Sequence, residues 1–364
     1  MLTEVILVAG LVDHDVGEEI WRSWPGSVLV RYDLRDLVQG VVRRWVDSEL
    51  TALELAHGCV SCTLGFDLVP LLERLGGRVV VHLDPRLEPE AICFALCETD
   101  VRVEAVVTVV DRATWLADAT GEDLLAERDR SATEDDDRTV AQIAVGPVEF
   151  ADCLVLTGAR ADLVLDAVLD RLNPRAARHD RRGLDAAALL GAIPPDARRG
   201  RFDDGFGTLL NGRPSREPSH GVAVVHFAAH RPMRLYDALD VLLDGVVRTR
   251  GRLWVVSQPD RALWLESAGG GLTIGSLGSW LAAVDDWSQV PPACHPAGAT
   301  GQDRRPGEPA QEVVVITVTT SPEEITRALR GALVTDEELA LADELEFVDP
   351  FAESHDEMDE MEEL

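Results

Sequence analysis

The chain has 364 residues, 46% of them hydrophobic, which is enough for about two domains with buried cores. Its formal net charge is −31, from 65 acidic and 34 basic residues, and every basic residue is arginine because the sequence contains no lysine. Nucleic-acid phosphates repel so acidic a chain, so we expect basic protein partners and no direct nucleic-acid binding. The missing lysine also excludes Schiff-base chemistry and a standard phosphate-binding loop.

The opening apolar run, VILVAGLV (5–12), is far shorter than the roughly 20 residues that a membrane-spanning helix needs. It lacks the basic flank of a signal peptide. Six cysteines at uneven spacing are too few for a disulfide scaffold in a chain of this length. We therefore expect a cytoplasmic protein with no membrane contact.

The first half alternates short apolar, β-branched runs with segments of helical periodicity. We expect strands at 5–9, 28–31, 78–83, 105–110 and 153–157, and helices at 35–55, 65–75, 87–97 and 161–172. Strands that alternate with helices predict an α/β fold, with a doubly wound and mostly parallel sheet.

Composition divides the chain into four parts. Residues 1–175 form the α/β domain, and 176–220, rich in Arg, Gly and Pro, read as a linker. Residues 221–335 predict a smaller α+β domain, with strands at 222–227, 252–257, 262–266 and 313–318 and helices at 233–244 and 322–332. Residues 336–364 carry 14 acidic residues and no arginine, which is typical of an acidic tail.

A cysteine pair stands out in the segment ELAHGCVSCTL (54–64). Cys59 and Cys62 have the spacing at which two thiolates converge on one metal ion, and His57 or Glu54 would add a third ligand. An incomplete set of this kind suits reversible zinc binding better than a structural site. Two alternatives stay open: a redox pair, and two small apolar residues left over from an ancestral site.

The order of several motifs resembles the CobW-type family of metal-related P-loop GTPases. ELAHGCVSCTL is similar to the family's Glu-Leu-x-x-Gly-Cys-x-Cys-Cys-Thr segment. AVVTVVD (105–111), the stretch at 138–158 and LNPRA (172–176) resemble its later motifs, and 230–255 resembles its C-terminal domain. The resemblance covers nearly the whole chain and implies a P-loop GTPase-like domain followed by a CobW C-terminal domain.

The nucleotide motifs of that family are degenerate here. Asp15 and Val16 stand at the Gly-Lys places of the phosphate loop, and His82 and Pro85 replace an acidic residue and a glycine near the γ-phosphate. The guanine-reading Asn-Lys-x-Asp is absent, with Asp162 a remnant only if the register slips by two residues. The sequence therefore argues against GTP binding and hydrolysis.

Within the family, these features look most like an actinobacterial subgroup of ribosome hibernation factor-recruiting GTPases. That resemblance implies a non-enzymatic adaptor that brings a hibernation-promoting factor to the ribosome during zinc shortage, with Cys59 and Cys62 sensing zinc. The alternative is a zinc metallochaperone with a nucleotide-driven cycle. The two hypotheses differ in their predictions, because only the second requires saturable GTP binding.

Overall fold

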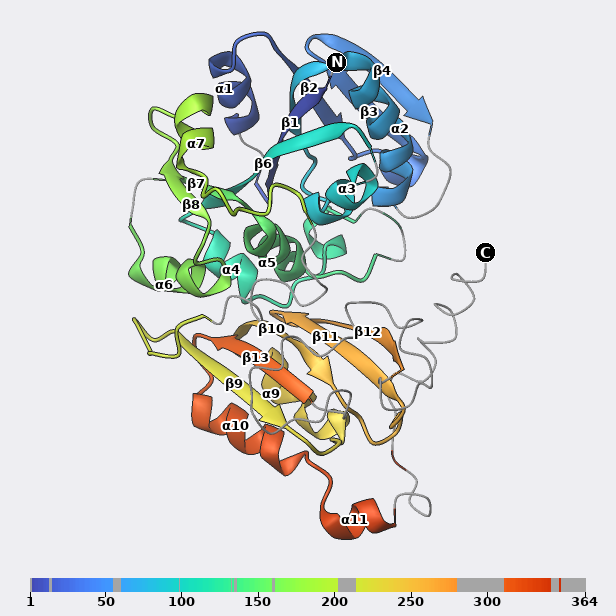
Figure 1. Cartoon of the computed structure of the whole chain (residues 1–364), viewed down its shortest axis with the longest axis vertical. Coiled ribbons are helices and arrows are strands. Elements are labelled where there is room, and N and C mark those ends of the chain that lie inside the picture. The colour runs from blue at the N-terminus through green and yellow to red at the C-terminus, as the bar shows by residue number, and fades with distance from the viewer. Residues whose placement is uncertain are drawn as a thin grey trace. The chain divides into compact units, whose positions relative to one another are not determined.

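The computed structural model describes residues 2–12, 15–54, 60–97, 99–131, 133, 136–158, 161–201, 214–279, 311–341 and 347. The chain divides into two compact units, Met1–Asp203 and Asp204–Leu364 (Figure 1). None of the helices in the described residues is long and apolar enough to cross a membrane.

An eight-stranded sheet forms the centre of the first unit. Its strands are β1 (Thr3–Gly10), β2 (Ser27–Asp33), β3 (Val41–Val46), β4 (Glu49–Glu54), β5 (Gly77–His82), β6 (Val101–Asp111), β7 (Cys153–Thr157) and β8 (Ala177–Asp180). They lie in the order β4-β3-β2-β5-β1-β6-β7-β8. Neighbours from β2 to β8 pair in parallel, and β3 and β4 add an antiparallel edge. The predicted α/β class with a mostly parallel sheet is confirmed.

Helices cover both faces of this sheet, as Figure 1 shows. They are α1 (Val16–Ser23), α2 (Val60–Leu75), α3 (Pro89–Leu96), α4 (Trp115–Ala119), α5 (Val140–Phe150), α6 (Leu163–Leu172) and α7 (Ala186–Ala192), with single turns η1 (Leu37–Gln39) and η2 (Ala126–Arg128). Strand β1 lies inside the sheet, between β5 and β6, and its side chains alternate between two cores. Leu7 lies in the core that includes residues of α2 and α3, and Ile6 in the core that includes residues of α1 and α7.

The prediction of one helix over 35–55 was wrong, because most of this segment forms the hairpin of β3 and β4. The link between the two strands is 47–48, and Asp47 has a φ of 52°. The Asp47 carboxylate accepts a hydrogen bond from the Leu29 amide at 2.9 Å. Pairing of β3 with β2 supplies the backbone partners that an isolated segment lacks, and this tertiary contact overrides the helical periodicity.

The range 176–220 also differs from its predicted role as a linker. Strand β8 pairs with β7 at the edge of the sheet, and α7 buries Leu189 in the core that it shares with α1. The boundary between the two units falls at Asp203–Asp204, inside the same range. The first part of this range therefore belongs to the folded first unit, although its short apolar stretches show little periodicity in the sequence.

The second unit is a five-stranded antiparallel sheet with helices on one face (Figure 1). Its elements are β9 (Ala223–Ala229), η3 (Leu235–Ala238), α9 (Leu239–Leu243), β10 (Val246–Leu253), β11 (Arg261–Ala268), β12 (Gly271–Ser279), β13 (Gln311–Thr317), α10 (Pro322–Gly331) and α11 (Asp336–Ala340). The strand order is β12-β11-β10-β13-β9. The predicted α+β class is confirmed, and β12 has no counterpart among the predicted strands.

Candidate metal site and phosphate-loop region

The segment that carries the cysteine pair begins at the carboxyl edge of the sheet. Strand β2 ends there at Asp33, which pairs with Arg43 of β3. The antiparallel partner β4 runs back to the same edge, where its last residue, Glu54, pairs with Val41. Helix α2 then begins at Val60. In doubly wound sheets this edge is where ligands bind.

The structure describes two of the four predicted metal ligands wholly or in part, and does not describe the other two. Glu54 is exposed at the end of β4, and Cys62 lies in the first turn of α2. The side chain of Cys62 and the whole of His57 and Cys59 lie outside the described residues. Within the described part of the chain, no group of three or more His, Cys, Asp and Glu side chains is placed to hold a metal ion. Two thiolates with a histidine or carboxylate form a donor set that suits zinc.

Acidic side chains lie in the region where a phosphate loop would be. Glu18 and Glu19 stand in the first turn of α1, directly after the carboxyl end of β1. Glu18 pairs with Arg31 at 3.2 Å. Glu19 pairs with Arg181, which follows β8, at 2.7 Å. A helix N-terminus favours negative charge, and here the protein's own side chains supply it.

Arg181 also reaches Asp15, the residue that precedes α1, at 3.4 Å. Asp15 makes no side-chain capping bond to the helix. A triphosphate bound at α1 would therefore meet three carboxylates and no lysine, and the two nearby guanidinium groups, of Arg31 and Arg181, are already paired with those carboxylates. This arrangement agrees with the sequence-based argument against a working phosphate loop.

His82 ends β5 next to this region. A Cβ atom added at Gly17 of α1 would lie 3.0 Å from the His82 side chain. The glycine thus allows the start of α1 to approach the end of β5. His82, which replaces the acidic residue of the resembled family, therefore packs its imidazole against α1.

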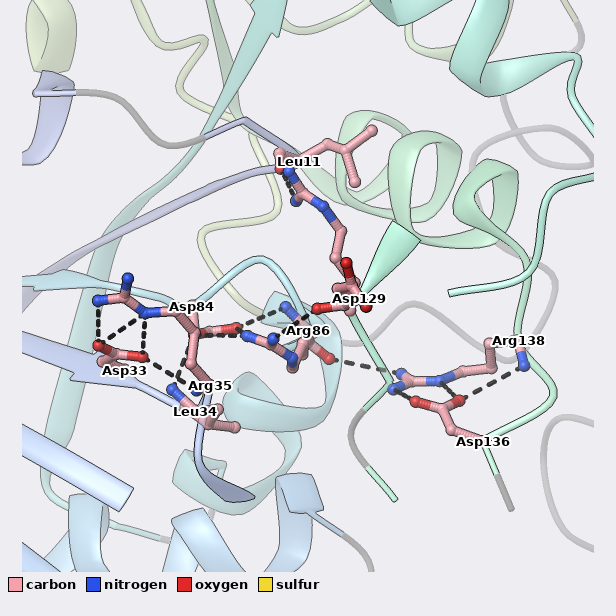
Figure 2. A network of polar contacts seen from close by, with 10 residues as sticks. Leu11, Asp33, Leu34, Arg35, Asp84, Arg86, Asp129, Asp136 and Arg138 are labelled. Carbon is pink, nitrogen blue, oxygen red and sulfur yellow. Dashed lines mark hydrogen bonds and ion pairs between the residues drawn. The ribbon is translucent and has the colours of Figure 1, made fainter. Parts of the chain in front are cut away.

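A buried ion pair follows β5. Asp84 and Arg86 approach to 3.0 Å, and their side chains are only 5% and 7% exposed. Asp84 also accepts a hydrogen bond from the Leu34 amide at 2.9 Å, just after β2. Arg86 donates to the Asp129 carbonyl at 3.3 Å. Figure 2 shows how this network joins three segments at the carboxyl edge.

Nearby side chains also contact Leu11, the residue that follows β1. Arg130 donates to the Leu11 carbonyl. Arg138 pairs with Asp136 at 2.8 Å (Figure 2). A cavity of about 660 Å³ opens beside it, and Arg31, His82 and Arg130 are among its lining residues. Sequence reasoning did not identify Asp84, Arg86 or Arg130, because an Asp or Arg in a loop has no local signal that distinguishes a buried partner from a solvated one.

Asp162, the proposed remnant of the guanine-reading motif, is engaged in helix capping. Its carboxylate accepts hydrogen bonds from the Val164 and Leu165 amides at 2.9 and 3.3 Å, at the start of α6. A second cavity of about 1200 Å³ lies at the ends of β7 and β8, lined in part by Thr157 and Arg181. Asp162 does not line it. The structure thus gives this residue a structural role.

The fold defines a class: an α/β protein with a mostly parallel sheet, joined to an antiparallel α+β unit, whose sequence carries the pair Cys59 and Cys62 after β4. Residues 221–333 match the model of the cobalamin synthesis protein cobW C-terminal domain. The chain is 41% identical to the zinc chaperone Rv0106 of Mycobacterium tuberculosis over 98% of its own length and 94% of that protein. The chain belongs to the CobW family.

Two more distant similarities accompany this assignment. A zinc-regulated GTPase metalloprotein activator of Dictyostelium discoideum is 24% identical, over 82% of this chain and 70% of that protein. The crystal structure of the Zn(II)-bound YjiA GTPase from E. coli aligns with 91% of this chain and 99% of its own, at 16% identity and a TM-score of 0.37.

Proposed function

We propose that this chain is a zinc metallochaperone, which binds zinc at the junction of β4 and α2 and passes it to a client protein. The observation that carries the proposal is the 41% identity, over almost the full length, to a protein described as a zinc chaperone. The position of the junction supports it, because Glu54 and the first turn of α2 lie at the ligand edge of the sheet. Zinc is the cargo in this proposal.

The experiment is a zinc titration against a chromophoric chelator. The variant Cys59→Ser, Cys62→Ser should bind zinc at least 100-fold more weakly, because thiolates supply the strongest ligands of the predicted set. The matched control is Cys97→Ser, since Cys97 is an exposed free cysteine of the same unit. Equal zinc affinity in the wild type and the double variant would contradict the proposal.

A nucleotide-driven cycle is the weaker part of the family's chemistry in this chain. The phosphate-loop lysine is absent, and Arg181 and Arg31 pair with the carboxylates at the start of α1. We therefore expect no saturable GTP binding by the wild type, with or without zinc. Saturable binding that changes with zinc would instead support a nucleotide-driven chaperone.

Recruitment of a hibernation-promoting factor to the ribosome stays a second proposal. The feature that favours it is the net charge of −31, which suits basic partners such as ribosomal proteins. Co-sedimentation with ribosomes and a hibernation factor, with and without zinc, tests it. Factor that reaches ribosomes only when this chain is present would support the adaptor role, and no dependence on the chain would remove it.

A further inference from the structure

The sheet of the first unit is open at β4. Strand β4 is the last strand in the order of that sheet, and in the described part of the chain no strand pairs with its outer side (Figure 1). An edge strand turns about half of its backbone N–H and C=O groups outward, where only water or an added strand can bond them. Strand β4 therefore offers a row of backbone groups to a further strand.

The other sheet edges in the described residues are less accessible. Most residues of β9 are buried, and the described side chains of β12 are mostly half-buried. Strand β8 is short, and its Arg178 pairs with Asp170 at 2.7 Å. Asp180, at the end of β8, pairs with Arg112 at 2.7 Å. In β4, by contrast, four of the six residues are exposed, so this edge is the one open to a partner.

An apolar side chain stands on this open edge. Leu50 is 54% exposed and lies directly opposite Trp45 of β3, which is itself opposite Arg31 of β2. The Arg31 guanidinium lies 5.8 Å from the centroid of the Trp45 ring. Paired residues share one face of a sheet, so the three side chains form a row that ends at the exposed leucine. A strand added to β4 would place an apolar side chain beside Leu50 and continue this row.

Acidic side chains mark both ends of β4. Glu49 and Glu54 are exposed, in a chain whose net charge is −31. If two copies of β4 paired antiparallel with Thr51 opposite Ala52, Glu49 of each copy would lie opposite Glu54 of the other. Like charges in direct opposition destabilise strand pairing. The edge therefore disfavours a second copy of this chain in that register, and it favours a segment with lysine or arginine at both ends.

We propose that β4 is a docking edge for a partner protein, in which an extended cationic segment of the partner pairs with β4 as an added strand. Lysine or arginine lies opposite Glu49 and Glu54, and an apolar residue lies beside Leu50. Backbone hydrogen bonds hold the segment, and the side chains select it. The inference goes beyond the proposed function, since it needs neither zinc nor nucleotide.

The probe is the capped peptide Lys-Val-Thr-Thr-Val-Lys, whose palindromic sequence matches β4 in either strand direction. Hydrogen exchange of the full chain is followed by mass spectrometry at millimolar peptide, with a zinc chelator present. We expect backbone exchange in 49–54 to slow by about threefold or more, and exchange in β8 to stay unchanged. Unchanged exchange in 49–54 would overturn the inference, whether or not the chain binds zinc in other experiments.

Two further peptides separate strand addition from general attraction of charge. Lys-Val-Pro-Pro-Val-Lys has the same charge, but its adjacent prolines remove a backbone donor on whichever side faces β4. Glu-Val-Thr-Thr-Val-Glu keeps the backbone and reverses the charge. Neither peptide should slow exchange in 49–54. Equal slowing by the proline peptide and the first probe would overturn strand addition.

Glu49→Lys tests the charge match. It should weaken binding of the first probe about fivefold, because an attractive cross-strand pair becomes a repulsive one. The peptide Lys-Val-Thr-Thr-Val-Glu should bind this variant more tightly than the wild type. The matched control is Glu323→Lys, the same change at an exposed glutamate of α10 in the other unit, which should leave binding of both peptides unchanged. Equal weakening in the two variants would assign the attraction to net charge and overturn the role of β4.

Discussion

Arg181 donates to the carboxylate of Glu19 at 2.7 Å, although 162 residues separate the two in the chain. The pair joins the turn after the last strand of the sheet to the first turn of α1. It therefore ties one edge of the sheet to the helix that follows the central strand. Glu19 comes just after the residues that correspond to the family's phosphate loop. The ion pair with Arg181 therefore lies in the region where that loop would contact a nucleotide.

A double-mutant cycle with Glu19→Gln and Arg181→Met measures this pair. The side chains are 30% and 37% exposed, so we expect a coupling energy of only about 0.5 kcal/mol in urea unfolding, declining with added salt. The more exposed pair Arg175–Asp196, at 56% and 69%, is the control and should show no coupling. Equal coupling in both pairs would contradict a specific role for Arg181.

Loss of the buried Asp84 carboxylate should be far more costly. Asp84→Asn leaves the Arg86 guanidinium, which is 7% exposed, without its counter-charge, and we expect a loss of about 3–5 kcal/mol of unfolding free energy. Adding Arg86→Met to that variant should recover part of the loss, because it removes the unpaired charge. Chemical denaturation of the three proteins checks this. A loss below about 1 kcal/mol would mean that the pair is solvated.

Stability should depend on pH through Glu266. Burial opposes its charged form, but Arg248 and Arg250 outweigh that effect and lower its pKa from 4.5 to about 2. A lowered pKa in the folded state means that the stabilisation is present above pH 4.5 and is lost as the pH falls toward 2. Its full size is on the order of 3 kcal/mol.

The measurement compares urea unfolding of wild type and Glu266→Gln from pH 2 to 6. The stability difference between the two should shrink as the pH falls through this window. Glu323→Gln, which changes an exposed glutamate of α10, should show no such trend. A difference that stays constant with pH would assign Glu266 an ordinary pKa.

Asp162 should behave as a helix cap and not as a base-reading residue. Asp162→Ala removes the acceptor for two amides at the start of α6, and we expect it to lower stability by about 1 kcal/mol. Asp162→Asn retains a capping oxygen and should cost much less. Neither variant should alter the response to GTP. A GTP response in the wild type that both variants abolish would restore the guanine-reading interpretation.

Some elements of the fold were predictable from the sequence, and others depend on tertiary contacts. The buried strands were predictable because runs such as VILVA at 5–9 and RVVVHL at 78–83 carry enough apolar, β-branched side chains to identify a strand without tertiary context. The hairpin of β3 and β4 was not, because Val41–Val46 is only half-buried and Glu49–Glu54, at the edge of the sheet, is largely exposed. Their conformation depends on the neighbouring strand β2.

The candidate metal site shows the same division. Cys59, Cys62, His57 and Glu54 are predicted as metal ligands from sequence, because thiolate spacing is a local property of the chain, and that assignment stays a prediction. The contacts of Asp67 with Tyr32 and Arg44 could not be predicted, since the three residues lie on three different elements. Their spacing in the sequence has no period that links them.

The sequence by itself determined the fold class, the cysteine motif and the absence of a lysine for phosphate binding, since each depends on residue type or short-range pattern. Only the tertiary structure decided which charges meet. It brought Glu19 to Arg181, Asp84 into a buried pair with Arg86, and Asp67 to Arg44. The reason is physical: an ion pair depends on the distance and burial of two side chains, and the fold sets both.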